Sequence, residues 1–368
     1  MQRTLDLTQS QLLLWTGQQL NPESPLYNMA FVFELPETIE IAHFRAAFQK
    51  IIEQSDALRT IFVLENGVPK QQVLPSFSYE IELLDWTEQS DAEANFWDWA
   101  KKRAQQAFAL DNCLFDSVLI QIADKKYYWF FNEHHLITDA WTSTLIYNTL
   151  ASYYQKSVEG KLTEVEGLHQ FQEYIEYEQL ARSNPKKQHL HEHWKKKAKG
   201  IVAPPSLYGY PRLEAGTHSE RVLVDLGKER SQKLRMLALE KDLRSWTVHS
   251  TLFNLFSTAL FTYLYRVSGQ QQLAIGTPAH NRVTKEFKET IGVFIELFPL
   301  MTKIEEKETF LSLFKKVRTE VNEFLRHAQP GTSTAELHRG FNVVLNYIHA
   351  QFKDFNGIPT HSKWLHAG

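Results

Sequence analysis

The sequence predicts a mixed α/β protein with two lobes, and three observations lead to this fold class. Segments with strand and helix periodicity alternate along the chain, with hairpins as well as crossovers, which is typical of mixed sheets covered by helices. The 368 residues exceed the size at which one hydrophobic core usually stops growing, so we expect two cores. The content of 43% hydrophobic and 23% charged residues is that of a globular protein with an apolar interior.

Local patterns place the elements of the first half. A helix begins near residue 8, because Thr8 and Gln11 form a capping-box pattern ahead of an apolar run. The dipeptide Asn66-Gly67 between two apolar runs predicts a hairpin turn. The other expected elements are a strand at 28–35, helices at 41–52 and 91–108, two strands between 114 and 135, and a helix from 139.

Residues 160–220 predict a boundary, because a helical run gives way to a basic run and then to a segment rich in Pro and Gly. We expect a first lobe at 1–178 and a second lobe at 179–368. The elements expected in the second lobe are strands at 220–226, 272–276, 293–303 and 341–348, and helices at 228–241, 248–267 and 308–326.

Charge and cysteine content narrow the classes of partner. A net charge of -3 and a pI near 6.6 provide no broad positive field for nucleic acid or an anionic membrane. The single cysteine, Cys113, excludes an internal disulfide and favours a reducing compartment, so we expect a cytoplasmic protein. We interpret Cys113 as a small buried hydrophobe in an apolar strand. The apolar run at 251–267 is shorter than the roughly 20 residues of a membrane span and predicts a buried helix.

The stretch NEHHLITDAW, at 132–141, is the strongest candidate site. Adjacent strand residues point to opposite faces, so His134 and His135 should have different roles and would seldom bind one metal ion. His135 lies where the chain leaves a buried strand, an edge from which a polar side chain can enter a cleft. A core histidine is the alternative. Thr138 or Asp139 can cap the following helix, and Asp139 can also pair with a cation.

Other chemical motifs are missing or weak. The chain has no G-x-S-x-G, G-x-x-x-x-G-K-[ST] or G-x-G-x-x-G motif, which disfavours serine hydrolysis, nucleotide hydrolysis and nicotinamide chemistry. The histidines at 189, 191 and 193 lie in a basic helix without the H-E-x-x-H order, so we predict a solvated helix face and no metal site.

At HHLITDA the chain resembles the H-H-x-x-x-D-G motif of nonribosomal peptide synthetase condensation domains, which are related in fold to chloramphenicol acetyltransferase. Further segments resemble motifs of that family in the same order along the chain. They are LTQSQLLLW, SPLYN, SDALRTIF, FQEYIEYEQ, IGTPAHNR, IGVFIELFPL and FNVVLNYI. The resemblance extends from Thr8 to about Ile348.

The resemblance implies a pseudo-dimer of two acetyltransferase-like lobes in a V, with a central substrate tunnel. There an acyl thioester on one phosphopantetheine arm would meet an amine on another, and an amide would form. The implied partners are upstream donor and downstream acceptor carrier proteins of a multidomain nonribosomal peptide or hybrid polyketide/peptide synthetase. Nucleic acid, membrane, metal and a cofactor bound by this chain itself are not implied.

The resemblance also implies roles for individual residues. His135 matches the catalytic histidine of the family and His134 its structural partner. Asp139 matches the motif aspartate, which the resemblance pairs with an arginine matched here by Arg59. We expect this ion pair to be buried and to hold the histidine loop rigid.

Three positions depart from the family pattern. Ala140 replaces the motif glycine, so we expect a narrower channel beside the catalytic histidine. Glu296 replaces an asparagine and Met301 an arginine, and with Trp141 and Ala140 we place Glu296 in the substrate tunnel. A carboxylate there would change substrate preference, with a polyketide or fatty acyl donor as one candidate. The chain ends soon after the late core strand, so we expect a shortened second lobe.

Two alternatives to amide formation remain. One is an ester-forming or free-amine acyltransferase of the same fold, which acceptance of a hydroxyl or a soluble amine would favour. The other is a catalytically silent module that docks carrier proteins. His135 favours an enzyme, whereas the altered motif around Glu296 favours the docking module.

Overall fold

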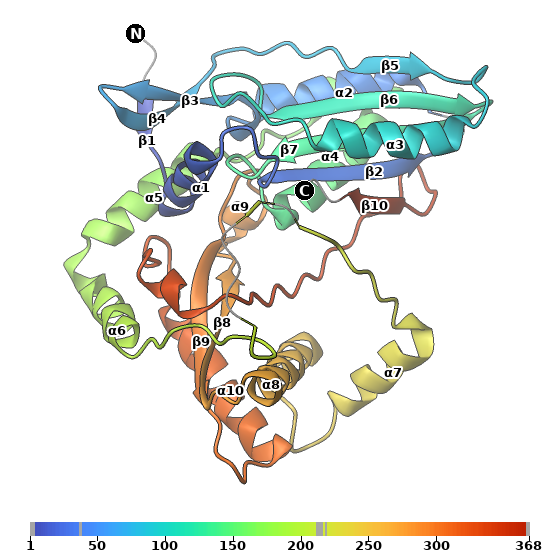
Figure 1. Cartoon of the computed structure of the whole chain (residues 1–368). Coiled ribbons are helices and arrows are strands. Elements are labelled where there is room, and N and C mark those ends of the chain that lie inside the picture. Colours follow the sequence, from blue (N-terminus) through green and yellow to red (C-terminus); the bar gives the residue numbers. More distant parts are fainter. Residues whose placement is uncertain (1–3, 37–38, 211–215, 218, 366–368) are drawn as a thin grey trace.

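The computed structural model describes residues 4–36, 39–210, 216–217 and 219–365, and its fold is mixed α/β as predicted (Figure 1). The strands are β1 (Thr4–Asp6), β2 (Asn28–Leu35), β3 (Thr60–Glu65), β4 (Val68–Val73), β5 (Glu82–Asp85), β6 (Phe115–Ala123), β7 (Lys126–His134), β8 (Gln272–Ala279), β9 (Glu296–Lys303) and β10 (His361–Leu365). The α-helices are α1 (Gln9–Leu20), α2 (Ile41–Gln54), α3 (Ala92–Ala104), α4 (Ala140–Val158), α5 (Phe171–Ser183), α6 (Gln188–Lys199), α7 (Gly227–Leu237), α8 (Val248–Ser268), α9 (Lys285–Lys288) and α10 (Phe310–His327). Short 3₁₀ helices are Ala57–Arg59, Leu162–Glu164, Pro185–Lys187 and Leu337–Gly340.

A five-stranded sheet forms the centre of the first half. Its strand order is β10-β2-β7-β6-β5, and only the β5–β6 pair is parallel. Successive side chains of β7 point to opposite faces: Trp129 and Phe131 join the core beneath α2 and α4, whereas Tyr128 and Phe130 pack against α3. The sheet therefore lies between these helices, with both faces buried (Figure 1).

A second core is built on the antiparallel pair β8–β9. Phe261 of α8, Val317 of α10 and Trp194 of α6 pack there against Phe298 of β9. In Figure 1 this group lies apart from the five-stranded sheet. The apolar run at 251–267 lies within α8, and no helix in the described part of the chain has the length and apolarity to cross a bilayer.

The predicted boundary at residue 178 lies within α5, and it stays a prediction. Segments from both sides of it pack together. Phe171 of α5 contacts Phe294 in the first core, with ring centroids 5.4 Å apart. At the end of the chain, β10 pairs with β2 in the five-stranded sheet. The two halves of the sequence are therefore connected by shared packing as well as by the chain.

Two predicted strands are wrong. Residues 220–226 form no strand, and the apolar side chains of Val222, Leu223 and Val224 are exposed. Residues 341–348 contribute only an isolated parallel bridge, between Val344 and Gly276. The apolar patterns suit strands, but a strand also needs a partner, and the described residues provide no ladder for either segment.

Candidate active site

The two histidines lie at the C-terminal end of β7, the central strand of the five-stranded sheet: His134 is its last residue and His135 follows it. The backbone N–H of His134 donates to the Leu114 carbonyl, and that of His135 donates to the Tyr27 carbonyl, both at 2.8 Å. These bonds hold the strand end between two neighbouring segments. The chain then turns through 135–138 into α4.

His134 is a core residue, only 1% exposed. Its Nδ1 accepts the Leu136 N–H at 3.1 Å, so the ring proton resides on Nε2, which lies 3.2 Å from Gln18 Oε1. The rings of Tyr27 and Phe108 lie 6.1 Å from its ring, centroid to centroid. Burial lowers the pKa of His134 to about 3. The ring is therefore neutral with both nitrogens engaged, as a structural role requires.

His135 has a different environment, because it is half-buried and lines a pocket. Its Nδ1 lies 2.8 Å from the Thr138 carbonyl oxygen. A carbonyl oxygen can only accept, so Nδ1 carries the ring proton and Nε2 keeps its lone pair. Burial lowers the pKa of His135, although the Asp139 carboxylate acts in the opposite direction. The ring is therefore neutral near pH 7, with Nε2 available as a hydrogen-bond acceptor.

Asp139 lies behind the histidine turn and is fully buried. As the N-cap of α4 it accepts the Thr142 N–H at 2.8 Å, and its other oxygen accepts the Phe294 N–H at 3.0 Å. Arg282 Nη2 lies 3.0 Å from Oδ1 and 3.2 Å from Oδ2. Burial alone would raise the pKa of Asp139, but Arg282 and these N–H donors lower it below its usual value. The result is a buried ion pair.

Arg282 is held by more than the carboxylate. It donates to the carbonyls of Phe287 at 2.6 Å, Thr290 at 2.7 Å and Gly292 at 3.2 Å. Its guanidinium carbon lies 4.0 Å from the centroid of the Phe294 ring. The guanidinium thus ties the loop between β8 and β9 to the helix that follows the histidine turn.

The predicted Arg59–Asp139 ion pair is wrong. Arg59 donates to three backbone carbonyls instead: Ile52 at 3.1 Å, Pro75 at 3.3 Å, and Leu74. These acceptors surround the short helix that carries Arg59 and engage its guanidinium. Asp139 pairs instead with Arg282, the arginine of the segment IGTPAHNR. This segment was recognised in the sequence, but no charge partner was predicted for its arginine.

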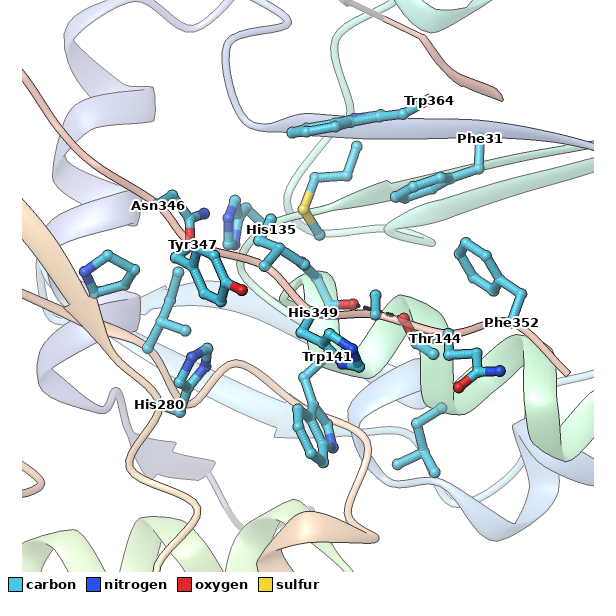
Figure 2. A pocket seen from close by; sticks show the side chains of 18 of the residues that line it. Phe31, His135, Trp141, Thr144, His280, Asn346, Tyr347, His349, Phe352 and Trp364 are labelled. Atoms are coloured by element: carbon cyan, nitrogen blue, oxygen red, sulfur yellow. Dashed lines mark hydrogen bonds between the residues drawn. The ribbon is translucent and has the colours of Figure 1, made fainter. Parts of the chain in front are cut away.

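The pocket beside His135 has a volume of about 850 Å³ and is lined by both halves of the chain. One side is aromatic: the Phe31 ring lies 6.3 Å from Phe352 and 6.0 Å from Trp364, centroid to centroid. Figure 2 shows these three rings gathered away from His135, whereas His280 lies on the side of His135. The pocket therefore has an apolar side and a side rich in nitrogen.

Comparisons with known proteins show the family of this chain. The family described as condensation domain matches residues 1–334. The chain belongs to the condensation domain family. It is 26% identical over 328 residues to a linear gramicidin synthase component of Brevibacillus parabrevis, and the match covers 85% of this chain and 6% of that protein. It is 26% identical over 325 residues to surfactin synthase subunit 1 of Bacillus subtilis (strain 168), with 87% and 9% covered. The condensation domain thus spans less than a tenth of either relative.

Solved structures show the same fold. A variant of the starter condensation domain of rhizomide synthetase, solved with C8-CoA, superposes with a TM-score of 0.83 at 23% identity, covering 99% of this chain and 83% of that one. The first condensation domain of the calcium-dependent antibiotic synthetase, with a substrate analogue, has a TM-score of 0.80 at 17% identity, covering 100% and 86%.

Two of the three residues placed in the tunnel of this condensation domain line the pocket. Ala140 and Trp141 open α4 at the side of His135. The indole N–H of Trp141 donates to the Lys288 carbonyl at 2.9 Å, which fixes the ring against the loop after β8. Their contact with substrate stays a prediction.

The placement of Glu296 in the pocket is wrong. Its neighbour Ile295 lines the pocket, whereas Glu296 begins β9 and is buried, with 2% exposed. Its carboxyl accepts N–H groups from Gly331 at 2.6 Å, Ser333 at 2.9 Å and Asn281 at 3.0 Å. Burial raises its pKa to about 8. Adjacent residues of an extended segment point to opposite sides, so only one of the two can face the pocket.

A buried carboxyl on β7, Glu133, was not predicted as part of the site. Ser143 of α4 donates to its Oε1, and its Oε2 has no hydrogen-bond partner in the described structure. Burial raises the pKa of Glu133 to about 8, so it is protonated at pH 7. The sequence did contain a signal for Glu133. It precedes the motif histidines directly, and side chains along a strand alternate between its two faces.

Two other candidates from the sequence lie outside the pocket. Cys113 is half-buried in the loop before β6 and not in a strand, and burial raises its thiol pKa to about 11. On α6, the His193 ring stacks on His327 at 3.7 Å between centroids. The prediction of a solvated face is therefore wrong for His193, which packs against α10, whereas His189 on the same helix is exposed.

Proposed function

We propose that this condensation domain transfers an acyl group from a thioester to an amine and forms an amide. The single observation that supports this reaction most is the state of His135. Its Nδ1–H donates to the Thr138 carbonyl, its Nε2 lone pair is available, and the ring lines a pocket large enough for two substrates to meet.

The proposed step is proton-balanced without another reactant. The amine lone pair attacks the thioester carbonyl carbon, the C–N bond forms, and a tetrahedral intermediate results. His135 Nε2 accepts the proton that the nitrogen loses, the C–S bond then breaks, and the imidazolium returns the proton to the thiolate. Such general acid–base help typically contributes about 10²- to 10⁴-fold, and alignment of the two reactants can contribute more.

The lining of the pocket supports a neutral attacking amine. Among the described residues that line it, none is Asp or Glu. A nearby carboxylate would stabilise the ammonium form and remove the lone pair needed for attack. An α-amino group has a pKa of about 7.7 to 8.0, so an appreciable fraction is neutral without a strong base.

The aromatic side supports an acyl chain as the donor group. Phe31, Phe352 and Trp364 offer apolar surface, and burying each methylene is worth about 0.8 kcal/mol. The rhizomide starter domain, which shares this fold, was solved with C8-CoA. We therefore propose a fatty acyl group as the donor.

We also propose that both substrates arrive on phosphopantetheine arms of carrier proteins within a larger cytoplasmic synthetase, and that the chain itself binds no cofactor. The relatives support this arrangement, because the matched region is 6% of the linear gramicidin synthase component and 9% of surfactin synthase subunit 1.

The test is intact-mass spectrometry of an aminoacyl-loaded acceptor carrier after incubation with an octanoyl-loaded donor carrier. We expect a mass gain of one acyl group with the wild type and with the control variant His191→Ala on α6, but not with His135→Ala. Carrier binding without any mass gain would indicate a docking module, and transfer only to a hydroxyl or a free amine would indicate the related acyltransferases.

A further inference from the structure

One corner of the pocket has a chemistry that the proposed reaction does not use. We call the side chains of His249, Tyr347 and His349 the basic corner. The His249 and His349 rings lie 4.0 Å apart between centroids, and His249 Nδ1 lies 2.9 Å from the Tyr347 hydroxyl. All three line the same pocket as His135.

The charged surroundings of the basic corner are positive. Burial lowers the pKa of His249, and His349 and Arg235 of α7 lower it further. Arg235 also acts on Tyr347, whose pKa is raised by burial and lowered by this positive charge. The cation Arg235 comes from α7. The hydrogen-bonding side chains come from the first turn of α8, which carries His249, and from the segment after residue 345, which carries Tyr347 and His349.

The rest of the pocket adds no negative charge. Apart from tyrosine, the ionisable side chains among its described lining residues are His135, His249, His280, His349 and Lys288. A polar ligand that complements such a surface is an anion, because charge-assisted hydrogen bonds are about twice as strong as neutral ones. One group donates in the hydrogen bond between His249 Nδ1 and the Tyr347 hydroxyl, so a neutral His249 and Tyr347 together leave one donor free for a ligand. An N–H of His349 supplies a second donor, and a carboxylate has two oxygens to accept them.

We propose that the amine acceptor carries a carboxylate, and that the basic corner binds it. Figure 2 places Tyr347 on the side of His135, away from the aromatic side where the acyl chain is proposed to lie. The carboxylate would thus be anchored on the side where the amine must meet the thioester. The term acceptor rests on the proposed acyl transfer, whereas carboxylate binding itself can be measured without any reaction.

The test compares binding of two isosteric probes, the aspartyl and asparaginyl thioesters of N-acetylcysteamine, to the His135→Ala variant by calorimetry. Because this variant lacks the proposed base, binding is measured apart from turnover. We expect about tenfold tighter binding of the aspartyl probe, equal to about 1.4 kcal/mol. The further changes His249→Asn and His349→Asn, each made separately, should reduce the ratio toward one, whereas His191→Asn on α6 should leave it unchanged.

Two results would overturn the proposal. One is equal binding of the two probes, and the other is a preference that persists in both corner variants with wild-type melting temperatures. Phosphopantetheine serves as a second anionic probe, with pantetheine as its neutral match. If only this pair depended on His249, the corner would bind the phosphate of a carrier arm and not an acceptor carboxylate. If the aspartyl preference holds while the intact-mass assay gives no product, the failure lies with the proposed reaction.

Discussion

His134 is the last residue of β7 and His135 is the first residue of the turn that follows, yet these two neighbours have different chemistry. His134 is buried, and Leu136 and Gln18 engage both of its ring nitrogens. His135 points to the pocket, where only Nδ1 has a partner among the described residues, the Thr138 carbonyl. Burial lowers the pKa of both rings, so both are neutral at pH 7.

His134 and His135 thus differ in hydrogen bonding and not in charge, because only His135 has a ring nitrogen, Nε2, without a partner among the described residues. A neutral histidine becomes a useful base only where one nitrogen is oriented by a donor bond and the other faces the reactants. The turn after β7 meets this condition for one residue of the pair. The predictions below test the comparison, from the largest expected effect to the smallest.

The largest effect is expected from removing the free nitrogen. For His135→Ala we expect the single-turnover rate of amide formation to fall by about 10²- to 10⁴-fold, with little change in melting temperature. Quenched-flow or timed intact-mass measurements provide the rate. A loss below tenfold would contradict this role. It would show that alignment of the substrates, and not proton transfer by His135, contributes most of the rate enhancement.

The next effect concerns the ion pair beneath His135. For Asp139→Ala we expect a loss of about 3 to 5 kcal/mol in the free energy of unfolding, because Arg282 would stay buried without its charge partner. Chemical denaturation measures it. The exposed pair of Lys233 and Glu229 supplies the control, since Glu229→Gln should cause no measurable change. An equally small change in Asp139→Ala would contradict the structural role of the pair.

A moderate effect is expected for His134, the buried member of the pair. For His134→Leu we expect a loss of about 1 to 3 kcal/mol at pH 7, because the Leu136 N–H loses its acceptor. The unfolded chain gains a proton on this histidine below pH 6.5, whereas the folded protein does not until about pH 3. The wild type should therefore lose stability as the pH falls through this window, and the variant should lose less. Identical pH profiles would contradict the assigned pKa.

The smallest change between neighbouring pH values is expected for Glu133, which precedes the two histidines. Its pKa is raised by burial from 4.5 to about 8, so the unfolded chain releases a proton that the folded chain retains. Stability should therefore fall as the pH rises from about 4.5 to about 8. Glu133→Gln should make this decline shallower by about 1 kcal/mol per pH unit. Melting temperatures across the window measure it, and an unchanged slope would show that Glu133 is ionised in the fold.

Sequence reasoning succeeded where the determinants are local. The capping box of Thr8 and Gln11 is present, and Asn66 and Gly67 adopt the positive φ angles of 52° and 78° that the predicted hairpin requires. The strand that ends at the histidines was also predicted, and Asp139, which caps α4, is one of the two predicted caps. Each of these features depends on residues within a few positions of one another.

Sequence reasoning failed where the partner of a residue lies far away in the sequence. Asp139 and Arg282 are 143 positions apart, and no periodicity shows which arginine reaches the aspartate. Arg59 was a plausible partner, but carbonyls next to its own short helix hold it. The side of Glu296 was misjudged by one residue, which on an extended segment reverses its direction. The strand at 220–226 failed because pairing needs a partner that the pattern does not reveal.

The measurement that most directly tests the account of His135 is its ¹⁵N nuclear magnetic resonance spectrum in the intact protein, titrated with pH. The bond to Thr138 predicts a neutral ring at pH 7 with the proton on Nδ1, an unprotonated Nε2, and a pKa below 6.5. A ring protonated on Nε2, or an imidazolium at pH 7, would contradict the proposal that His135 accepts the proton of the attacking amine.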